Sequence, residues 1–212
     1  MGYIGTKPSA VPLTSADITD GIITSAKIAD GTIVNADINA SAAIASTKLS
    51  GVGANAGEVI QVVSTHKQDT FSLSATLTFT DITGLSVSIT PSSASNKILI
   101  FVNLCMGNGA NGARTAFRLV RTSTAIGGGT ASGSRQSTMM SLAITNDTNT
   151  QENGGFHFLD SPSTTSSTTY KVQMIAGDGY TGYINRSGSD SDTNDAYGSR
   201  TASTITVMEV KG

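Results

Sequence analysis

Residues 16–49 repeat with a period of ten residues. The stretch ADITDGIITS at residues 16–25 is followed by AKIADGTIVN at residues 26–35, and two weaker copies continue to residue 49. Each of the first two copies carries a turn dipeptide, Asp20-Gly21 or Asp30-Gly31. Isoleucine recurs at one position of the repeat and again halfway between, at Ile18, Ile23, Ile28, Ile33 and Ile38.

Such a thin strip of isoleucines has no second layer in its own chain to cover it. A repeat that cannot bury its apolar face needs neighbours, and identical chains around a threefold axis would supply them. We therefore expect residues 16–57 to form a repetitive shaft and linker, with the five isoleucines as the core of a homotrimer. The alternative is a disordered linker, but linkers rarely space large aliphatic residues so evenly.

From Glu58 onward, apolar residues alternate with polar ones. The series Phe71–Phe79, Leu85–Ile89 and Tyr170–Ala176 each show a period of two, which is typical of strands with one buried face. Stretches rich in Gly, Ser, Pro and Asn separate about ten such runs. Together with scarce helix-forming residues, this predicts an all-β protein in which residues 58–212 form a jelly-roll-like antiparallel β-sandwich.

Two of the expected strands are apolar on both faces. Residues 98–104 place Leu99 and Phe101 opposite their other aliphatic residues, and Val210 shares the second face of the last strand. Because a sandwich strand normally has one polar face, we expect a subunit contact to cover the second one, although a loop or the N-terminal segment could do so instead. The residues expected in the head core or trimer interface are Ile98, Ile100, Val102, Ile205, Val207 and Met208.

The composition excludes several classes of protein. Charged residues make up 13% of the 212 residues and the net charge is -2, so no basic face for nucleic acid is expected. No apolar run is long enough to span a membrane, and the first residues lack the apolar core of a signal peptide. The single cysteine, Cys105, lies in an apolar run and is expected to be a buried small hydrophobe.

Motifs with chemical potential are present but incomplete, so no catalytic, cofactor-binding or metal-binding residue and no enzyme activity is expected. Residues 107–112 match G-x-G-x-x-G but lack the acidic residue and second βαβ unit of a dinucleotide site, which favours a hairpin loop. His66 and His157 with one cysteine make no zinc site. Glu152 and Asp160 are the only close carboxylate pair of the head with apolar neighbours. Residues 190–195 resemble the start of a calcium loop but lack its Gly and Glu, which leaves only a looser calcium site open.

Two segments are candidates for contacts with other molecules. The Gly-rich stretch 177–186 presents Tyr180, Tyr183 and Arg186, which could form a patch that stacks on sugars, although ordinary strand tyrosines are the alternative. Residues 1–15 have almost no charge and no ten-residue period, which suits an arm that becomes ordered against another protein. The residues expected to dock there are Tyr3, Ile4, Pro8, Val11, Pro12 and Leu13.

The opening GYIGTKP and the repeats SADITDG and AKIADGTI resemble the N-terminal regions of phage tail fibres and related virion proteins. The C-terminal stretch 202–210 is similar to the last strand of their jelly-roll heads, which resemble the trimeric C1q and tumour-necrosis-factor fold. The resemblance implies a trimeric structural protein of a phage particle. Since the first residues lack a signal core, we expect it to be assembled in the cytoplasm of the bacterial host. It does not distinguish a site on the tail from one on the capsid. The function that we expect is a short trimeric tail fibre that attaches to another virion protein through its N-terminus and contacts a host glycan or other receptor through its head. A capsid decoration, cement or head-fibre protein is one alternative, and a fibre head that depolymerises polysaccharide is a second.

Overall fold

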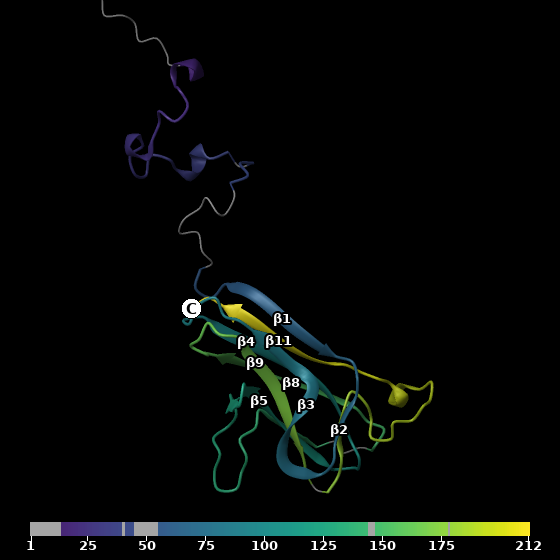
Figure 1. The fold of residues 1–212 in the computed structure, drawn as a ribbon. Coiled ribbons are helices and arrows are strands. Elements are labelled where there is room, and N and C mark those ends of the chain that lie inside the picture. The colour runs from purple at the N-terminus through teal and green to yellow at the C-terminus, as the bar shows by residue number, and fades with distance from the viewer. Residues whose placement is uncertain (1–13, 40, 45–54, 144–146, 178) are drawn as a thin grey trace, which may run out of the picture. The chain divides into compact units, whose positions relative to one another are not determined.

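The computed structural model describes residues 14–39, 41–44, 55–143, 147–177 and 179–212 (Figure 1). The chain divides into two compact units, residues 1–53 and residues 54–212. The six residues expected to dock on another protein, between Tyr3 and Leu13, lie outside the described residues.

The first unit keeps the ten-residue period in its backbone. Three short 3-10 helices follow one another, η1 (Ser15–Asp17), η2 (Ser25–Lys27) and η3 (Asn35–Asp37). Each is closed by a hydrogen bond from its last N–H to the carbonyl three residues earlier, as from Lys27 N to Thr24 O at 2.9 Å. Turns lie between them, and Gly21 and Gly31 adopt the positive φ angles of 80° and 78° that glycine allows most readily. The repeat is therefore a chain of locally bonded turns, and it contains no strand among its described residues.

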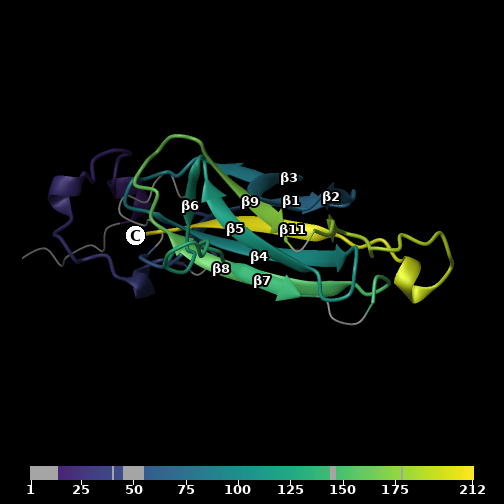
Figure 2. The same cartoon turned by 90° about the horizontal axis from the view of Figure 1, so that it is seen from below.

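The second unit is a sandwich of two antiparallel sheets (Figures 1 and 2). The first sheet contains, side by side, β8 (Glu152–Asp160), β4 (Lys97–Asn108), β11 (Ser203–Val210) and β1 (Val59–Lys67), extended at one end by β10 (Gly182–Ile184) and β2 (Phe71–Leu73). The second sheet contains β3 (Thr76–Ile89), β9 (Thr168–Ala176) and β5 (Arg114–Arg121), with β6 (Thr124–Ile126) and β7 (Met140–Ala143) both beside β5. A further 3-10 helix, η5, spans Ala196–Gly198.

The chain crosses repeatedly from one sheet to the other, as in a jelly roll. No α-helix occurs within the described ranges. The predicted all-β, jelly-roll-like sandwich is thus confirmed. We call the end of the sandwich that holds the start of β1 the base, and the opposite end, where β1 and β4 finish, the tip.

Alternation along the strands builds the core. Ile98, Ile100 and Val102 of β4 and Ile205 and Val207 of β11 point inward, as predicted for one face of each strand. They pack against the buried face of the second sheet, which includes Phe117, Leu119, Tyr170, Val172 and Met174. These five residues of β4 and β11 therefore line the interior of one subunit, whereas Met208 is half-buried on the opposite face of its strand.

Two local predictions were wrong, because neither alternation nor a Gly-rich motif shows which sheet the next strand joins. Residues 71–79 are not one strand, since β2 ends at Leu73 and β3 begins at Thr76 in the other sheet. Leu77, expected on a buried face, is 74% exposed. The loop at residues 109–113 is not a hairpin, because it joins β4 of the first sheet to β5 of the second.

A buried carboxylate fastens the base. The side chain of Glu209 accepts hydrogen bonds from Asn96 Nδ2 at 2.6 Å, from the amide and hydroxyl of Ser92 at 2.7 and 2.8 Å, and from Gln61 Nε2 at 2.6 Å. Burial acts to raise the pKa of Glu209, but the hydrogen bonds outweigh it and lower the pKa from 4.5 to about 2. This carboxylate ties the last strand to β1 and to the turn between β3 and β4.

Glu209→Gln should reduce the free energy of unfolding at pH 7 by about 1–3 kcal/mol, because one charged acceptor is lost and its donors remain. A depressed pKa contributes stability that is complete above the unfolded value of 4.5 and is lost as the pH falls toward 2. In denaturant melts at pH 7, 4 and 2.5, the difference in unfolding free energy between wild type and Glu209→Gln should therefore shrink as the pH falls. A gap between wild type and variant that is equally wide at pH 2.5 would contradict this role for Glu209.

Candidate interaction surfaces

The repeat presents a row of exposed isoleucines, which we call the isoleucine strip: Ile18, Ile23, Ile28, Ile33 and Ile38. Their exposed fractions lie between 38% for Ile28 and 54% for Ile23 and Ile33. Ile22, Val34 and Ile44 are exposed beside them. The described part of the chain therefore leaves the strip open to solvent, as the sequence predicts for a repeat without a second layer.

Local hydrogen bonds hold the strip in shape without packing. The amide and hydroxyl of Thr14 donate to Asp17 Oδ2 at 2.8 and 2.7 Å, and the amide of Val34 donates to Asp37 Oδ2 at 2.9 Å. The backbone and hydroxyl hydrogen bonds from Thr14 lower the pKa of Asp17. Carboxylates that cap short turns in this way favour the turn conformation, so η1 and η3 are held by local hydrogen bonds within the chain.

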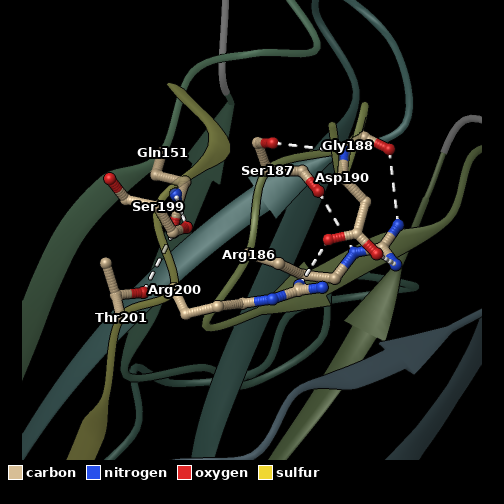
Figure 3. A network of polar contacts seen from close by, with 8 residues as sticks. All are labelled: Gln151, Arg186, Ser187, Gly188, Asp190, Ser199, Arg200 and Thr201. Atoms are coloured by element: carbon tan, nitrogen blue, oxygen red, sulfur yellow. Dashed lines mark hydrogen bonds and ion pairs between the residues drawn. The ribbon is translucent and has the colours of Figure 1, made fainter. Parts of the chain in front are cut away.

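The tip of the head brings together two of the three candidate receptor residues. The guanidinium of Arg186 lies 4.1 Å from the centre of the Tyr183 ring and 2.6 Å from Asp190 Oδ2. Arg200 pairs with the other oxygen of Asp190, so that one carboxylate serves two arginines (Figure 3). Arg186 also donates to the backbone carbonyls of Ser187 and Gly188. The charge of Arg186 is thus engaged in holding its own loop, which the sequence reading did not anticipate.

The same loop is anchored to the sheets by two further residues. Gln151 Nε2 donates to Ser199 O at 2.8 Å and Gln151 Oε1 accepts from Thr201 Oγ1 at 2.9 Å (Figure 3). The buried Asn185 has a φ of 63°. Its amide donates to the carbonyls of Lys67 and Asp69, both at 2.9 Å. A positive φ is common for asparagine in turns, but the two carbonyls that its amide reaches lie more than a hundred residues away and no local pattern indicates them.

Tyr180 stands apart as an exposed ring at the tip. In the preceding residues, Ala176, Gly177 and Gly179 line an open hollow of about 330 Å³ together with Ala75, Thr76 and Leu77. The hollow and Tyr180 are the part of the predicted receptor region that remains open to a ligand.

The carboxylates, histidines and cysteine do not assemble into a reactive site in the described residues. Asp190 is occupied by two arginines, and no group of three His, Cys, Asp or Glu side chains that could hold a metal occurs there. Glu152 and Asp160 lie at opposite ends of β8, about 27 Å apart along the strand. Asp160 is buried and accepts hydrogen bonds from Tyr170 and Arg121. The burial of Tyr170 and, second, its hydrogen bond to Asp160 raise the pKa of Tyr170.

The remaining candidates have structural surroundings. His66 on β1 and His157 on β8 are separated by two intervening strands, and both side chains point outward. Cys105 is a buried free thiol, as predicted, and burial raises its pKa. No helix within the described residues is long and apolar enough to cross a membrane.

No known protein family matches the chain, and no curated protein matches it. Among solved structures, it is similar to that of the infectious bursal disease virus Gx strain, with 12% identity, a TM-score of 0.41 and 72% of this chain covered. It is also similar to the infectious bursal disease virus VP2 subviral particle (13% identity, TM-score 0.35, 71% covered) and to Eiger TNF from S. frugiperda (6%, 0.30, 70%). The chain spans 32% and 38% of those two viral chains and 92% of the Eiger TNF chain. At these identities the likeness concerns the fold alone.

Proposed function

We propose that this chain is a structural protein of a bacteriophage virion, a short homotrimeric tail fibre in which the repeat forms the shaft and the sandwich forms the head. The observation that supports the proposal is the isoleucine strip, which recurs between locally hydrogen-bonded turns and whose side chains are exposed along its whole described length. Exposed aliphatic residues at a constant interval are costly in water. They favour lengthwise contact with identical strips, which present the same interval.

A comparison of the free energy of isoleucine burial with the cost of association shows whether the strip alone can hold three chains together. Burying the exposed half of an isoleucine contributes about 1 kcal/mol, so five per chain give about 15 kcal/mol for three chains. Joining three bodies costs two losses of translational and rotational freedom, each about 4–15 kcal/mol. The strip therefore brings the trimer close to balance, and a second contact between chains is needed to make it stable.

The two ends of the fibre have different roles in this proposal. Residues 1–15 attach it to another structural protein of the particle, because their apolar residues and prolines suit an extended arm that becomes ordered on docking. At the tip, Tyr180 and the open hollow beside it contact a glycan of the host surface. Each contact is weak, but three heads on one fibre raise the effective concentration of the binding sites.

Light scattering on the purified full chain should give about three times the chain mass of 21.6 kDa. Gold-labelled antibody against the head should decorate intact particles that carry the protein, at the tail. The proposal would be contradicted by a stable, well-folded monomer at micromolar concentration, or by purified particles without label. Label on the capsid would replace the tail fibre by a capsid decoration or head fibre, while the trimeric structural role would stand.

A further inference from the structure

The outer face of the first sheet carries an apolar band that crosses all four long strands. Val62 of β1 lies opposite Met208 of β11, Met208 opposite Leu99 of β4, and Leu99 opposite Leu159 of β8. Residues directly opposite in a sheet share a face, so these four side chains form one row. In the next row toward the tip, the Phe101 ring lies 6.1 Å from that of His157. We call Val62, Met208, Leu99, Leu159 and Phe101 the apolar band.

The band is open within one chain. Val62 is 55% exposed, Leu159 46% and Phe101 43%, while Leu99 and Met208 are half-buried among them. In the row of Phe101 the face already becomes polar, because Thr206 lies opposite Phe101 and shares a hydrogen bond of 2.8 Å with Ser64. The apolar part therefore lies in the base half of the sheet and leaves the tip loops free.

The outer face of the second sheet shows how a solvated face of this protein is built. There Arg118 donates to Gln173 at 2.8 Å and lies 3.9 Å from the centre of the Phe79 ring, and Lys171 pairs with Asp81 at 2.7 Å. Its polar side chains satisfy one another within the chain, as expected for the water-facing side of an antiparallel sheet. The first sheet has no such network over the band, so its outer face has the character of an interface.

The chemistry of this face selects an uncharged partner. The outward positions of β1, β11, β4 and β8, all of them described, carry no aspartate or glutamate, and their basic side chains are Lys97, His66 and His157. A face of four strands covers roughly 500 Å² in projection. Specific contacts use about 800 Å² of accessible surface per partner, so this face with its rim is large enough for a stable contact.

The partner most available to this face is another copy of the chain, a step that rests on the proposed trimeric shaft. Only ten residues, 45–54, separate Ile44 from Asn55, and ten residues span at most about 35 Å. Heads that share a shaft are therefore held at an effective concentration in the millimolar range. We propose that the apolar band is the surface through which the heads of identical chains pack on one another, as the second contact that the strip requires.

A matched pair of leucines tests this proposal in the full-length protein. Leu159 lies in the band, and Leu77 lies in β3, outside it, and is the more exposed of the two at 74%. Because Leu77 lines the hollow at the tip, its variant is a control for assembly and not for receptor binding. Neither glutamate would be buried in a single chain, so Leu159→Glu and Leu77→Glu should both keep the folded head, with wild-type circular dichroism and a cooperative thermal transition. In a dilution series followed by light scattering, Leu159→Glu should raise the concentration for half-assembly by about a hundredfold, whereas Leu77→Glu should leave it unchanged.

The outcomes separate this proposal from the proposed function. If the wild-type protein is a monomer, the proposed trimeric fibre itself is wrong. A trimeric wild type with equal assembly of both variants overturns the band as the contact between heads and leaves the fibre standing. If Leu159→Glu assembles normally but is missing from particles while Leu77→Glu is incorporated, the band docks on a different virion protein and the contact between copies is excluded.

Discussion

Replacing Ile100 with aspartate should abolish folding of the head, whereas the same change at the next residue, Phe101, should leave the head folded. Ile100 is fully buried between the two sheets, and Phe101 is 43% exposed on the opposite face of β4. An unpaired charge in the core costs several kcal/mol, against a total stability of about 5–15 kcal/mol for a typical domain. The exposed aspartate at position 101 meets water instead.

Circular dichroism and thermal melting of the two purified variants distinguish these effects. Ile100→Asp should be insoluble or lack a cooperative transition, while Phe101→Asp should keep a cooperative transition but assemble more weakly, because its side chain lies in the apolar band. The sequence reading expects both faces of this strand to be covered. If Ile100→Asp melts normally, the inward face of β4 is wrongly assigned, and if Phe101→Asp fails to fold, the band belongs to the core of one chain.

The sequence predicted the alternation of β4 and β11 but not which of their two apolar faces is the core. Both faces read as aliphatic over residues 98–102, and a period of two says only that Leu99 and Ile100 point in opposite directions. The choice depends on what lies on each side. Ile100 shares the buried core with Phe117 and Tyr170 of the second sheet, while Leu159 and Met208 flank Leu99 on the open face. These pairings join residues tens of positions apart, which no local pattern encodes.

At the tip, too, the local sequence does not show which charged residues pair with one another. The acidic series from Asp190 suggests a cation site when read along the chain, yet the cations that Asp190 binds are the guanidinium groups of Arg186 and Arg200. One arginine lies four residues before it and the other ten residues after it, so a closed loop is needed to bring both to one carboxylate. The repeat is the opposite case, because its turns are bonded only to residues two or three positions away and its period is fully visible in the sequence.

Replacing Ile18, Ile28 and Ile38 together with serine should dismantle the trimer without unfolding the head. The three isoleucines stand at the same position of successive repeats and are 43%, 38% and 41% exposed. Their burial in a shaft contributes about 3 kcal/mol per chain. Its loss should raise the concentration for half-assembly at least a hundredfold, since each 1.4 kcal/mol is about a factor of ten. The turns should persist, because backbone and carboxylate hydrogen bonds form them.

The matched control replaces Ala16, Ala26 and Ala36 with serine, three exposed residues with the same spacing in the same 3-10 helices. It introduces the same three hydroxyls into the repeat but removes almost no apolar surface, so it should assemble like wild type. Both triple variants should show the wild-type melting of the head, since the sandwich forms a compact unit of its own from residue 54 onward. If the isoleucine variant assembles at the same concentration as the alanine variant, the strip does not hold the chains together. The trimer would then depend on its heads alone, and the repeat would serve as a tether whose isoleucines are free to bind a different protein of the particle.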